Sequence, residues 1–399
     1  MSIHRVAQRG AALALLFLAA CGDSGDSVGP PEGVGTLSGV VRSASAGAAL
    51  EGATISAGGL QATSGADGRF VLAGVPAGAA TVRCERAGYV AQEAAITIAA
   101  GANSRDFTLA AREIFEFGTS AVYVPAEVGA LRGAIIVLGG PVASAFVTGN
   151  VLAPGLPPDV EASGQALGAG LRALAKAERV ALFGSRTTGM ENGPASDDAL
   201  FAALGTAAQL SGHAELAAAP VVMYGISGGG PEASGLASRH PERAIGVIAR
   251  APSGLSTLTD PAALGVPTFV MLAELDVVVS NTFLRMTAAA NRAQGGLWAL
   301  ALEPGVEHFG GSSANNETTI GWISAALARR LPAEPGGPLV ALTEASGWLG
   351  NPATLEIAPW DAYVGDRAAA SWLLSEAAAV AWRALTGPIA GAPPAAASR

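Results

Sequence analysis

Lysine is almost absent from this sequence: Lys176 is the only one among 399 residues, against 22 arginines, and the net charge is −9. No basic cluster with interleaved aromatic residues occurs either. Proteins that bind nucleic acids need a positive surface to hold the phosphates. The sequence therefore argues against a nucleic-acid partner.

Long apolar runs are missing beyond the first 21 residues, although half of all residues are hydrophobic. Much of this apolar content is alanine, dispersed among Gly, Pro, Arg and Glu. A helix that spans a membrane needs about 20 consecutive apolar residues. We therefore expect no spanning helix after the N-terminal segment.

The N-terminal segment has the pattern of a secretory signal peptide. Arg5 and Arg9 precede the apolar run AALALLFLAA, and small residues lead to Cys21. The tetrapeptide LAAC resembles the bacterial lipobox, which implies removal of residues 1–20 and lipidation of Cys21. A plain cleaved signal peptide is the alternative. Because Gly22 rather than aspartate follows, the resemblance favours the outer membrane, so we expect a protein of the bacterial cell envelope, lipid-anchored through Cys21 or secreted.

Cysteine is scarce, since Cys84 is the only one besides Cys21. After lipidation no intramolecular disulfide is possible. Cys84 lies in an alternating stretch, which predicts a buried strand residue without a reactive role. Between the two cysteines, residues 21–35 are rich in Gly, Pro, Ser and acids, which indicates a flexible tether.

Residues 36–111 read as an all-β module. Short alternating runs at 36–43, 53–57, 69–75, 80–89 and 94–100 are separated by turn clusters, with Asp67-Gly68 as a tight turn. Such spacing predicts a small β-sandwich. The segment ATSGADGRFVLAGVPAG, the later AGY and the final FTL resemble a carboxypeptidase regulatory-like (transthyretin-like) domain. The resemblance implies a non-catalytic spacer or surface-interaction module.

From residue 112 to 385 the pattern changes to strands that alternate with helices. This arrangement predicts a doubly wound, mostly parallel sheet covered by helices on both faces, in which ligands bind at the carboxyl ends of the strands. Strands are expected at 120–127, 133–140, 179–185, 220–227, 244–252, 267–276 and 297–305, and helices at 165–178, 198–216, 231–242, 281–294 and 318–330.

The pentapeptide Gly225-Ile226-Ser227-Gly228-Gly229 has the form G-x-S-x-G. With 53 glycines in the chain, a match arises by chance about once in two such sequences, so the motif alone decides nothing. Its context is more informative, because a strand precedes Ser227 and a helix follows it. A serine at such a sharp turn needs small neighbours and can act as a nucleophile.

A nucleophilic serine needs a base and an acid that orients it. His308 lies in a loop just beyond the last strand, whereas His4 leaves with the signal peptide and His213 and His240 read as polar residues at helix ends. Asp276 ends the penultimate strand. Its rivals for the role of the acid are Glu274 and, more remotely, Asp260, while Glu307 beside the histidine reads as solvated. The chain order is then Ser227, Asp276, His308.

This combination resembles the α/β-hydrolase family. YGISGGGPEASGLASRHPERAIGVI is similar to the nucleophile elbow of that family, LAELDVVV to its acid loop and GVEHF to its histidine loop. IIVLGGPV is similar to its oxyanion segment, with Leu138 in place of the usual histidine. The resemblance implies backbone donors at Gly140 and Gly228, and no metal or organic cofactor. Arg186 and the loop around it follow another strand end, where they either line a pocket or are simply exposed.

The C-terminal part is less regular. Three of the six tryptophans lie between residues 348 and 372, and Trp382 follows. This extension either packs on the α/β domain or forms an aromatic lid that faces the substrate, and 368–387 reads as helical. Residues 386–399 are expected to form a disordered tail.

The sequence thus predicts a serine hydrolase that cleaves small-molecule or polymeric carboxylic esters with Ser227, His308 and Asp276. A peptidase or amidase of the same fold is an alternative that this set of residues leaves open. The alternative from another class is a non-catalytic surface binding lipoprotein, in which the β-module is the working part.

Overall fold

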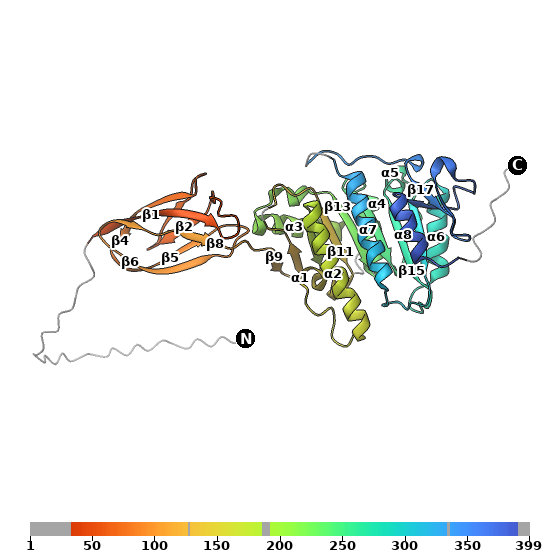
Figure 1. Cartoon of the computed structure of the whole chain (residues 1–399), viewed down its shortest axis with the longest axis horizontal. Coiled ribbons are helices and arrows are strands. Elements are labelled where there is room, and N and C mark those ends of the chain that lie inside the picture. The colour runs from red at the N-terminus through yellow and green to blue at the C-terminus, as the bar shows by residue number, and fades with distance from the viewer. Residues whose placement is uncertain (1–32, 127, 186–191, 333–335, 390–399) are drawn as a thin grey trace, which may run out of the picture.

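The computed structural model describes residues 33–389 except 127, 186–191 and 333–335. An all-β module comes first, and a larger body with a central sheet follows it (Figure 1). Several predicted features lie outside the described residues: the signal peptide, Cys21, most of the tether, Arg186 and residues 390–399.

The N-terminal module is a β-sandwich of two four-stranded sheets, as predicted. One sheet has the order β4-β1-β7, with β8 also paired to β1, and the other has the order β3-β2-β5-β6. Alternate residues of β4 are buried between the sheets, as the sequence alternation requires. The strands are β1 (Val34–Ser43), β2 (Thr54–Ala57), β3 (Leu60–Thr63), β4 (Arg69–Pro76), β5 (Gly78–Glu85), β6 (Gln92–Ile98), β7 (Gly101–Ser104) and β8 (Phe107–Leu109).

Two details of this module follow directly from the sequence. Gly68 of the predicted turn has a φ of +75°, and a Cβ there would lie 2.5 Å from the Val41 carbonyl oxygen, so only glycine fits. Cys84 is fully buried in β5, and burial raises the pKa of its thiol to about 11.

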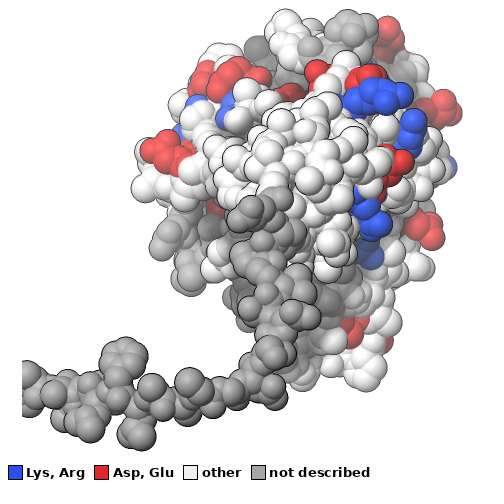
Figure 2. Space-filling model, turned by 90° about the vertical axis from the view of Figure 1, so that its left-hand side faces the viewer, with Lys and Arg blue, Asp and Glu red and all other residues white. Residues whose placement is uncertain are grey.

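Figure 2 shows the end of the molecule that this module forms, where charged side chains lie toward the edges and the middle is uncharged.

The module contacts the larger body through the turn at Gly88. The Gly88 amide donates to the Leu210 carbonyl near the end of a helix, and the Arg112 amide donates to the Gly88 carbonyl. Gly88 has a φ of +82°, and a Cβ there would lie 2.6 Å from the Ser211 carbonyl oxygen. A larger residue at this position would therefore separate the two backbones.

The body is built on an eight-stranded sheet with the order β16-β15-β14-β13-β11-β12-β10-β9. All neighbours from β12 to β16 are parallel, and only β10 pairs antiparallel with β12 and β9. Counted along the chain, the strands lie in the spatial order 1-2-4-3-5-6-7-8. The strands are β9 (Ile114–Phe117), β10 (Ser120–Tyr123), β11 (Ala134–Leu138), β12 (Ala181–Ser185), β13 (Val221–Ile226), β14 (Ala244–Arg250), β15 (Thr268–Ala273) and β16 (Trp298–Glu303).

Helices cover both faces of this sheet, as the continuous apolar strands predict. Ile135 and Val137 of β11 face the helices α1, α2 and α7, while Ile136 and Leu138 face α3 and α4. The helix α6 packs on the same face as α3 and α4, against Val270 and Leu272 of β15. The helices are α1 (Ala143–Thr148), α2 (Pro158–Glu178), α3 (Pro194–Ser211), α4 (Gly229–Arg239), α5 (Pro261–Leu264), α6 (Asn281–Ala293) and α7 (Ser313–Arg330), with 3-10 turns at η1 (Gly140–Val142) and η2 (Ala214–Ala218).

The C-terminal extension packs on the outer strand β16 and is not a lid. Its small sheet, order β18-β17-β19, consists of β17 (Trp348–Gly350), β18 (Ile357–Pro359) and β19 (Ser371–Leu373), with 3-10 turns at η3 (Glu344–Ser346) and η4 (Trp360–Ala362). The Trp382 indole N–H donates to the Leu300 carbonyl at 2.7 Å, and the Ser371 hydroxyl donates to the same carbonyl at 3.2 Å. The extension thereby satisfies edge groups of β16 that another chain could otherwise pair with.

Two predictions for this region are wrong. The segment 368–387 is not one helix, because β19 precedes α8 (Glu376–Leu385) and the Ser375 hydroxyl accepts from Ala378 N–H to begin the helix. The predicted disordered tail does not start at Thr386, since the Gly387 amide donates to the Leu302 carbonyl and Ile389 is buried. Among the helices that the structure describes, none has the length and apolarity that crossing a membrane requires.

Candidate active site

Ser227 lies on a strained turn between β13 and α4. Its φ is +51°, a conformation that costs a non-glycine residue about 1–2 kcal/mol. The glycines on either side permit it. A Cβ on Gly225 would lie 2.2 Å from the Gly229 carbonyl oxygen, and a Cβ on Gly229 would lie 2.2 Å from the Leu138 carbonyl oxygen. The turn presents the hydroxyl at the carboxyl end of the sheet, beside the end of β11.

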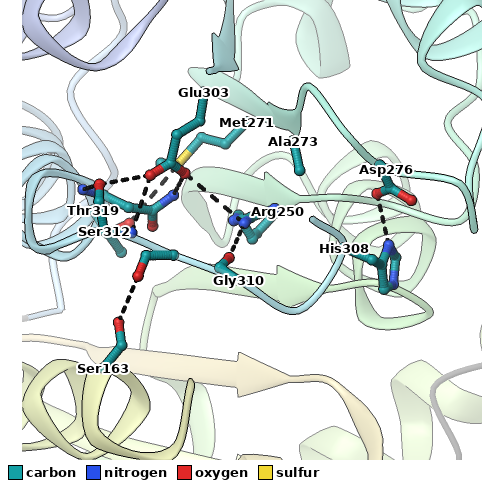
Figure 3. A network of polar contacts seen from close by, with 12 residues as sticks. Ser163, Arg250, Met271, Ala273, Asp276, Glu303, His308, Gly310, Ser312 and Thr319 are labelled. Atoms are coloured by element: carbon teal, nitrogen blue, oxygen red, sulfur yellow. Dashed lines mark hydrogen bonds and ion pairs between the residues drawn. The ribbon is translucent and has the colours of Figure 1, made fainter. Parts of the chain in front are cut away.

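The structure brings together the three residues that the sequence singled out. The His308 Nε2 atom lies 2.9 Å from the Ser227 hydroxyl, and its Nδ1 atom lies 2.7 Å from Asp276 Oδ2 (Figure 3 shows the second contact). His308 and the Asp276 side chain are almost entirely buried, with side-chain exposures of 4% and 0%. Both hydrogen bonds are therefore largely shielded from competing water.

Asp276 is held as a carboxylate. Its Oδ1 atom accepts hydrogen bonds from the Val278 and Val279 amides at 2.8 and 3.1 Å. Burial by itself would raise the pKa of this carboxyl. The hydrogen bond from His308, the two amides and the charge of the imidazole outweigh burial, and the net effect lowers the pKa. An ionised carboxylate only accepts, so Nδ1 of His308 must carry the proton and Nε2 is free to accept one.

The rival acids lie elsewhere. The Glu274 carboxylate accepts the Gly305 amide at the base of the histidine loop, and Asp260 caps the N-terminus of α5 through the Ala262 amide. Glu307 is exposed.

The other described histidines also make contacts of their own. His213 pairs with Glu215 at 2.9 Å, and His240 contacts Asp197 at 3.2 Å. His308 is thus the described histidine that contacts Ser227.

A buried polar network lies behind the histidine loop (Figure 3). Glu303, at the end of β16, accepts hydrogen bonds from the Ser312 amide and hydroxyl at 3.1 and 2.6 Å and from Asn315 Nδ2 at 2.6 Å. Arg250, at the end of β14, lies 3.9 Å from Glu303 and donates to the Gly310 carbonyl. Both charged side chains are about 95% buried. They fasten residues 310–315, directly after His308, to the sheet.

This network was not predicted from the sequence. A signal was present, because Arg250 and Glu303 are charged residues at the carboxyl ends of otherwise apolar strands. Their side chains are one more set of polar groups at the edge of the sheet where the chemistry was expected.

The predicted oxyanion donors Gly140 and Gly228 lie at the carboxyl ends of two neighbouring strands, β11 and β13. Gly228 directly precedes α4, and Gly140 begins the 3-10 turn η1 after β11, the neighbour of β13. Of the backbone hydrogen bonds in the turns and loops of the described residues, none has the Gly140 or the Gly228 amide as its donor. Their role in binding an oxyanion stays a prediction.

The strand order and the serine at the turn after the fifth strand define an α/β-hydrolase-like fold for the body. Residues 36–110, within the N-terminal module, match the model of the carboxypeptidase regulatory-like domain. That match agrees with the β-sandwich in fold and in extent.

Comparisons with other proteins give distant likenesses. A search of curated proteins finds no match. The chain is 14% identical to a predicted CIB-like hydrolase from Thermoplasma acidophilum, over 53% of this chain and 96% of that one, with a TM-score of 0.34. A protein of unknown function from Agrobacterium tumefaciens, proposed to be an alpha/beta hydrolase, is 16% identical over 54% of this chain and 94% of that one, with a TM-score of 0.37.

A third likeness concerns a smaller part of the chain. It is to a type II cohesin–X-dockerin complex from Acetivibrio cellulolyticus, with 25% identity, 20% of this chain covered and a TM-score of 0.18. The chain spans 58% of the length of that structure. The fold assignment therefore rests on the strand order and the turn at Ser227.

Proposed function

We propose that this protein is a serine hydrolase that cleaves carboxylic esters through an acyl-enzyme. The observation that carries the proposal is the hydrogen-bonded chain from Ser227 through His308 to Asp276, with distances of 2.9 and 2.7 Å. The serine and the carboxylate each lie within hydrogen-bond reach of the histidine between them, which is the arrangement that acyl transfer by a nucleophile, a base and an orienting acid requires.

In the first half-reaction, the Ser227 oxygen attacks the ester carbonyl carbon while His308 Nε2 takes the hydroxyl proton. The Gly228 and Gly140 amides are the proposed donors to the oxyanion that forms. The tetrahedral intermediate then expels the alcohol, which leaves with the proton from Nε2. Asp276 stabilises the imidazolium and holds its tautomer.

In the second half-reaction, water replaces the alcohol. His308 takes a proton from the water, whose oxygen attacks the acyl carbon and displaces Ser227. The proton returns to the serine oxygen, the carboxylic acid leaves and the free enzyme is restored. The two half-reactions together use side chains and backbone amides of this protein and consume one water molecule.

The proposal is tested by ester turnover in matched variants. Ser227→Ala and His308→Ala should each lower kcat/KM for p-nitrophenyl acetate at least 1,000-fold, because residues of a triad act as a unit. Ser234→Ala is the control, since that hydroxyl on α4 donates to the Pro231 carbonyl at 3.3 Å. Full turnover by Ser227→Ala would refute the proposal. Faster cleavage of peptides than of esters would replace the ester assignment by a peptidase.

We also propose that the protein is anchored to the bacterial cell envelope through a lipid on Cys21. The LAAC sequence supports this assignment. Cells that express the full chain should incorporate labelled palmitate into it, and a Cys21→Ser variant should not. Equal labelling of both would exclude this anchor. In that position the β-module would act as a spacer between the membrane and the catalytic body.

A further inference from the structure

Exposed apolar side chains gather on the two loops that carry Asp276 and His308 and on the first turns of α6. In the described part of the chain, fourteen large hydrophobic side chains are exposed, and six of them lie here. This set includes both exposed phenylalanines and the exposed methionine. Single exposed apolar residues are ordinary, but a group beside a polar site indicates binding. We call this group the apolar rim: Leu275, Val277, Val278, Phe283, Met286 and Phe309.

The rim borders the candidate active site through direct contacts. Leu275 and Val277 flank Asp276 in the chain, and the Leu275 amide donates to the Val306 carbonyl, which joins the acid loop to the histidine loop. The Phe309 ring stands edge-on against the His308 imidazole, with 4.6 Å between the ring centres. The rim is therefore continuous with the residues that carry the proposed chemistry.

The remaining rim residues follow on the helix after the acid loop. Phe283 and Met286 lie three residues apart on α6, so they share one face of its first turns. The Asn281 side chain donates to the Ala273 carbonyl at 2.8 Å and fastens the start of α6 to the end of β15. The helix that carries Phe283 and Met286 is thus held to the sheet at its first residue.

These side chains protrude rather than pack. Val277 is 95% exposed and Met286 is 67% exposed. Such residues add little to the stability of the fold, because the hydrophobic effect stabilises only surface that leaves water. An apolar group that covered these side chains would remove their surface from water and so lower the free energy of the complex.

The position of His308 indicates which part of an ester would cover the rim. Nε2 must return its proton to the departing oxygen, so the alcohol part of the ester lies on the histidine side of the scissile bond. The rim is on that side, since Phe309 contacts His308 and Val277 adjoins Asp276. The proposed oxyanion donors, Gly140 and Gly228, belong to the ends of other strands.

We propose that the apolar rim binds the alcohol part of the ester, and that the substrate is an ester of an extended apolar alcohol. This inference rests on the proposed ester hydrolysis by Ser227. It names a substrate class and a binding surface that the catalytic residues do not define by themselves.

The test is a series of alkyl acetates from methyl to octyl acetate, all below their solubility limits, with acid release followed in a pH-stat. kcat/KM reports the steps up to release of the alcohol, so it senses the alcohol chain. Complete burial of one methylene favours binding about fourfold, and contact on one side gives about half of that free energy. kcat/KM should therefore rise about twofold for each added methylene.

The double variant Val277→Ser/Met286→Ser should flatten this rise, because it replaces two of the apolar side chains that a longer alcohol would cover. The control is Val71→Ser/Val364→Ser, which changes two equally exposed side chains in the β-module and the C-terminal extension. The control should keep the slope of the unaltered protein.

Three results would overturn the inference. One is the same slope in the rim variant and the control, and another is no slope in the unaltered protein. The third is a rate that rises with the acyl chain of ethyl esters and not with the alcohol chain. In all three, turnover of methyl acetate would still support the proposed function, whereas absence of any ester turnover would refute the proposed function and this inference together.

Discussion

Replacement of Glu303 by alanine tests whether the buried network holds the histidine loop. The change removes an acceptor of three hydrogen bonds, two from Ser312 and one from Asn315. It also leaves Arg250 buried without its countercharge at 3.9 Å, and Arg250 Nη1 already lacks a hydrogen-bond partner among the described residues. We expect the change to lower the free energy of unfolding of the body and to displace His308.

The magnitude follows from the burial of the pair. Loss of one partner from a buried ion pair costs about 3–5 kcal/mol, and a domain has only about 5–15 kcal/mol in total. We therefore expect the free energy of unfolding to fall by about 4 kcal/mol. A displacement of His308 by about 1 Å would lower kcat/KM about 100-fold. Glu303→Gln should cost less, because an amide oxygen can still accept the bonds from Ser312.

Urea unfolding followed by tryptophan fluorescence suits this test. All six tryptophans lie between residues 298 and 382, so the signal reports the body and not the β-module. Glu307→Ala is the matched control, because this glutamate is exposed and lies four residues after Glu303, in the loop that follows β16. It should change stability by less than about 0.5 kcal/mol. A loss of less than 1 kcal/mol in Glu303→Ala, with unchanged kcat/KM, would refute the role given to the network.

Three further predictions follow from the structure. Gly229→Ala should destabilise the body by about 1–3 kcal/mol, because its Cβ would meet the Leu138 backbone at 2.2 Å. The control is Gly205→Ala, at a helical glycine whose Cβ would have nothing within 4 Å, and it should be neutral or stabilising in the same urea titration. Equal effects of the two changes would contradict the tight packing described for the turn at Ser227. The pKa of Asp276 is lowered in the folded protein, so its carboxylate stabilises the fold above the unfolded pKa of about 3.9 and loses this effect as the pH falls through the folded pKa. The difference in unfolding free energy between the unaltered protein and Asp276→Asn should therefore shrink below about pH 4. A difference that stays constant with pH would contradict the stabilising role of the carboxylate. Cys84, with its thiol pKa raised to about 11 by burial, should resist a thiol reagent at pH 8 in a Cys21→Ser variant and react fully in urea; rapid reaction of the folded protein would show that the thiol is accessible.

Much of the fold could be predicted from the sequence because its signals are local. Continuous apolar strands between amphipathic helices predict a parallel sheet with two covered faces, and the structure has it. The position of the three candidate residues followed from the same reasoning. In a parallel sheet the carboxyl ends of the strands meet at one edge, so Ser227, Asp276 and His308, each just after a strand, come together there.

What the sequence could not predict depends on tertiary contacts. The segment around Trp372 has helical composition, but pairing with β17 makes it a strand. The alanine-rich end after Thr386 looks disordered, yet the edge of β16 binds its first residues. The contact between Arg250 and Glu303 joins residues 53 positions apart in the chain. Their place at the ends of apolar strands marks each residue as unusual, but no local pattern shows that the two contact each other.

The most direct test of the central claim is covalent labelling of the purified, folded protein with a fluorophosphonate, followed by peptide mass spectrometry. The account predicts a single adduct on the peptide that contains Ser227. The adduct should form much more slowly in His308→Ala and not at all in Ser227→Ala. A folded protein that takes up no label, or that carries the label on another serine, would contradict the claim that Ser227 is the nucleophile.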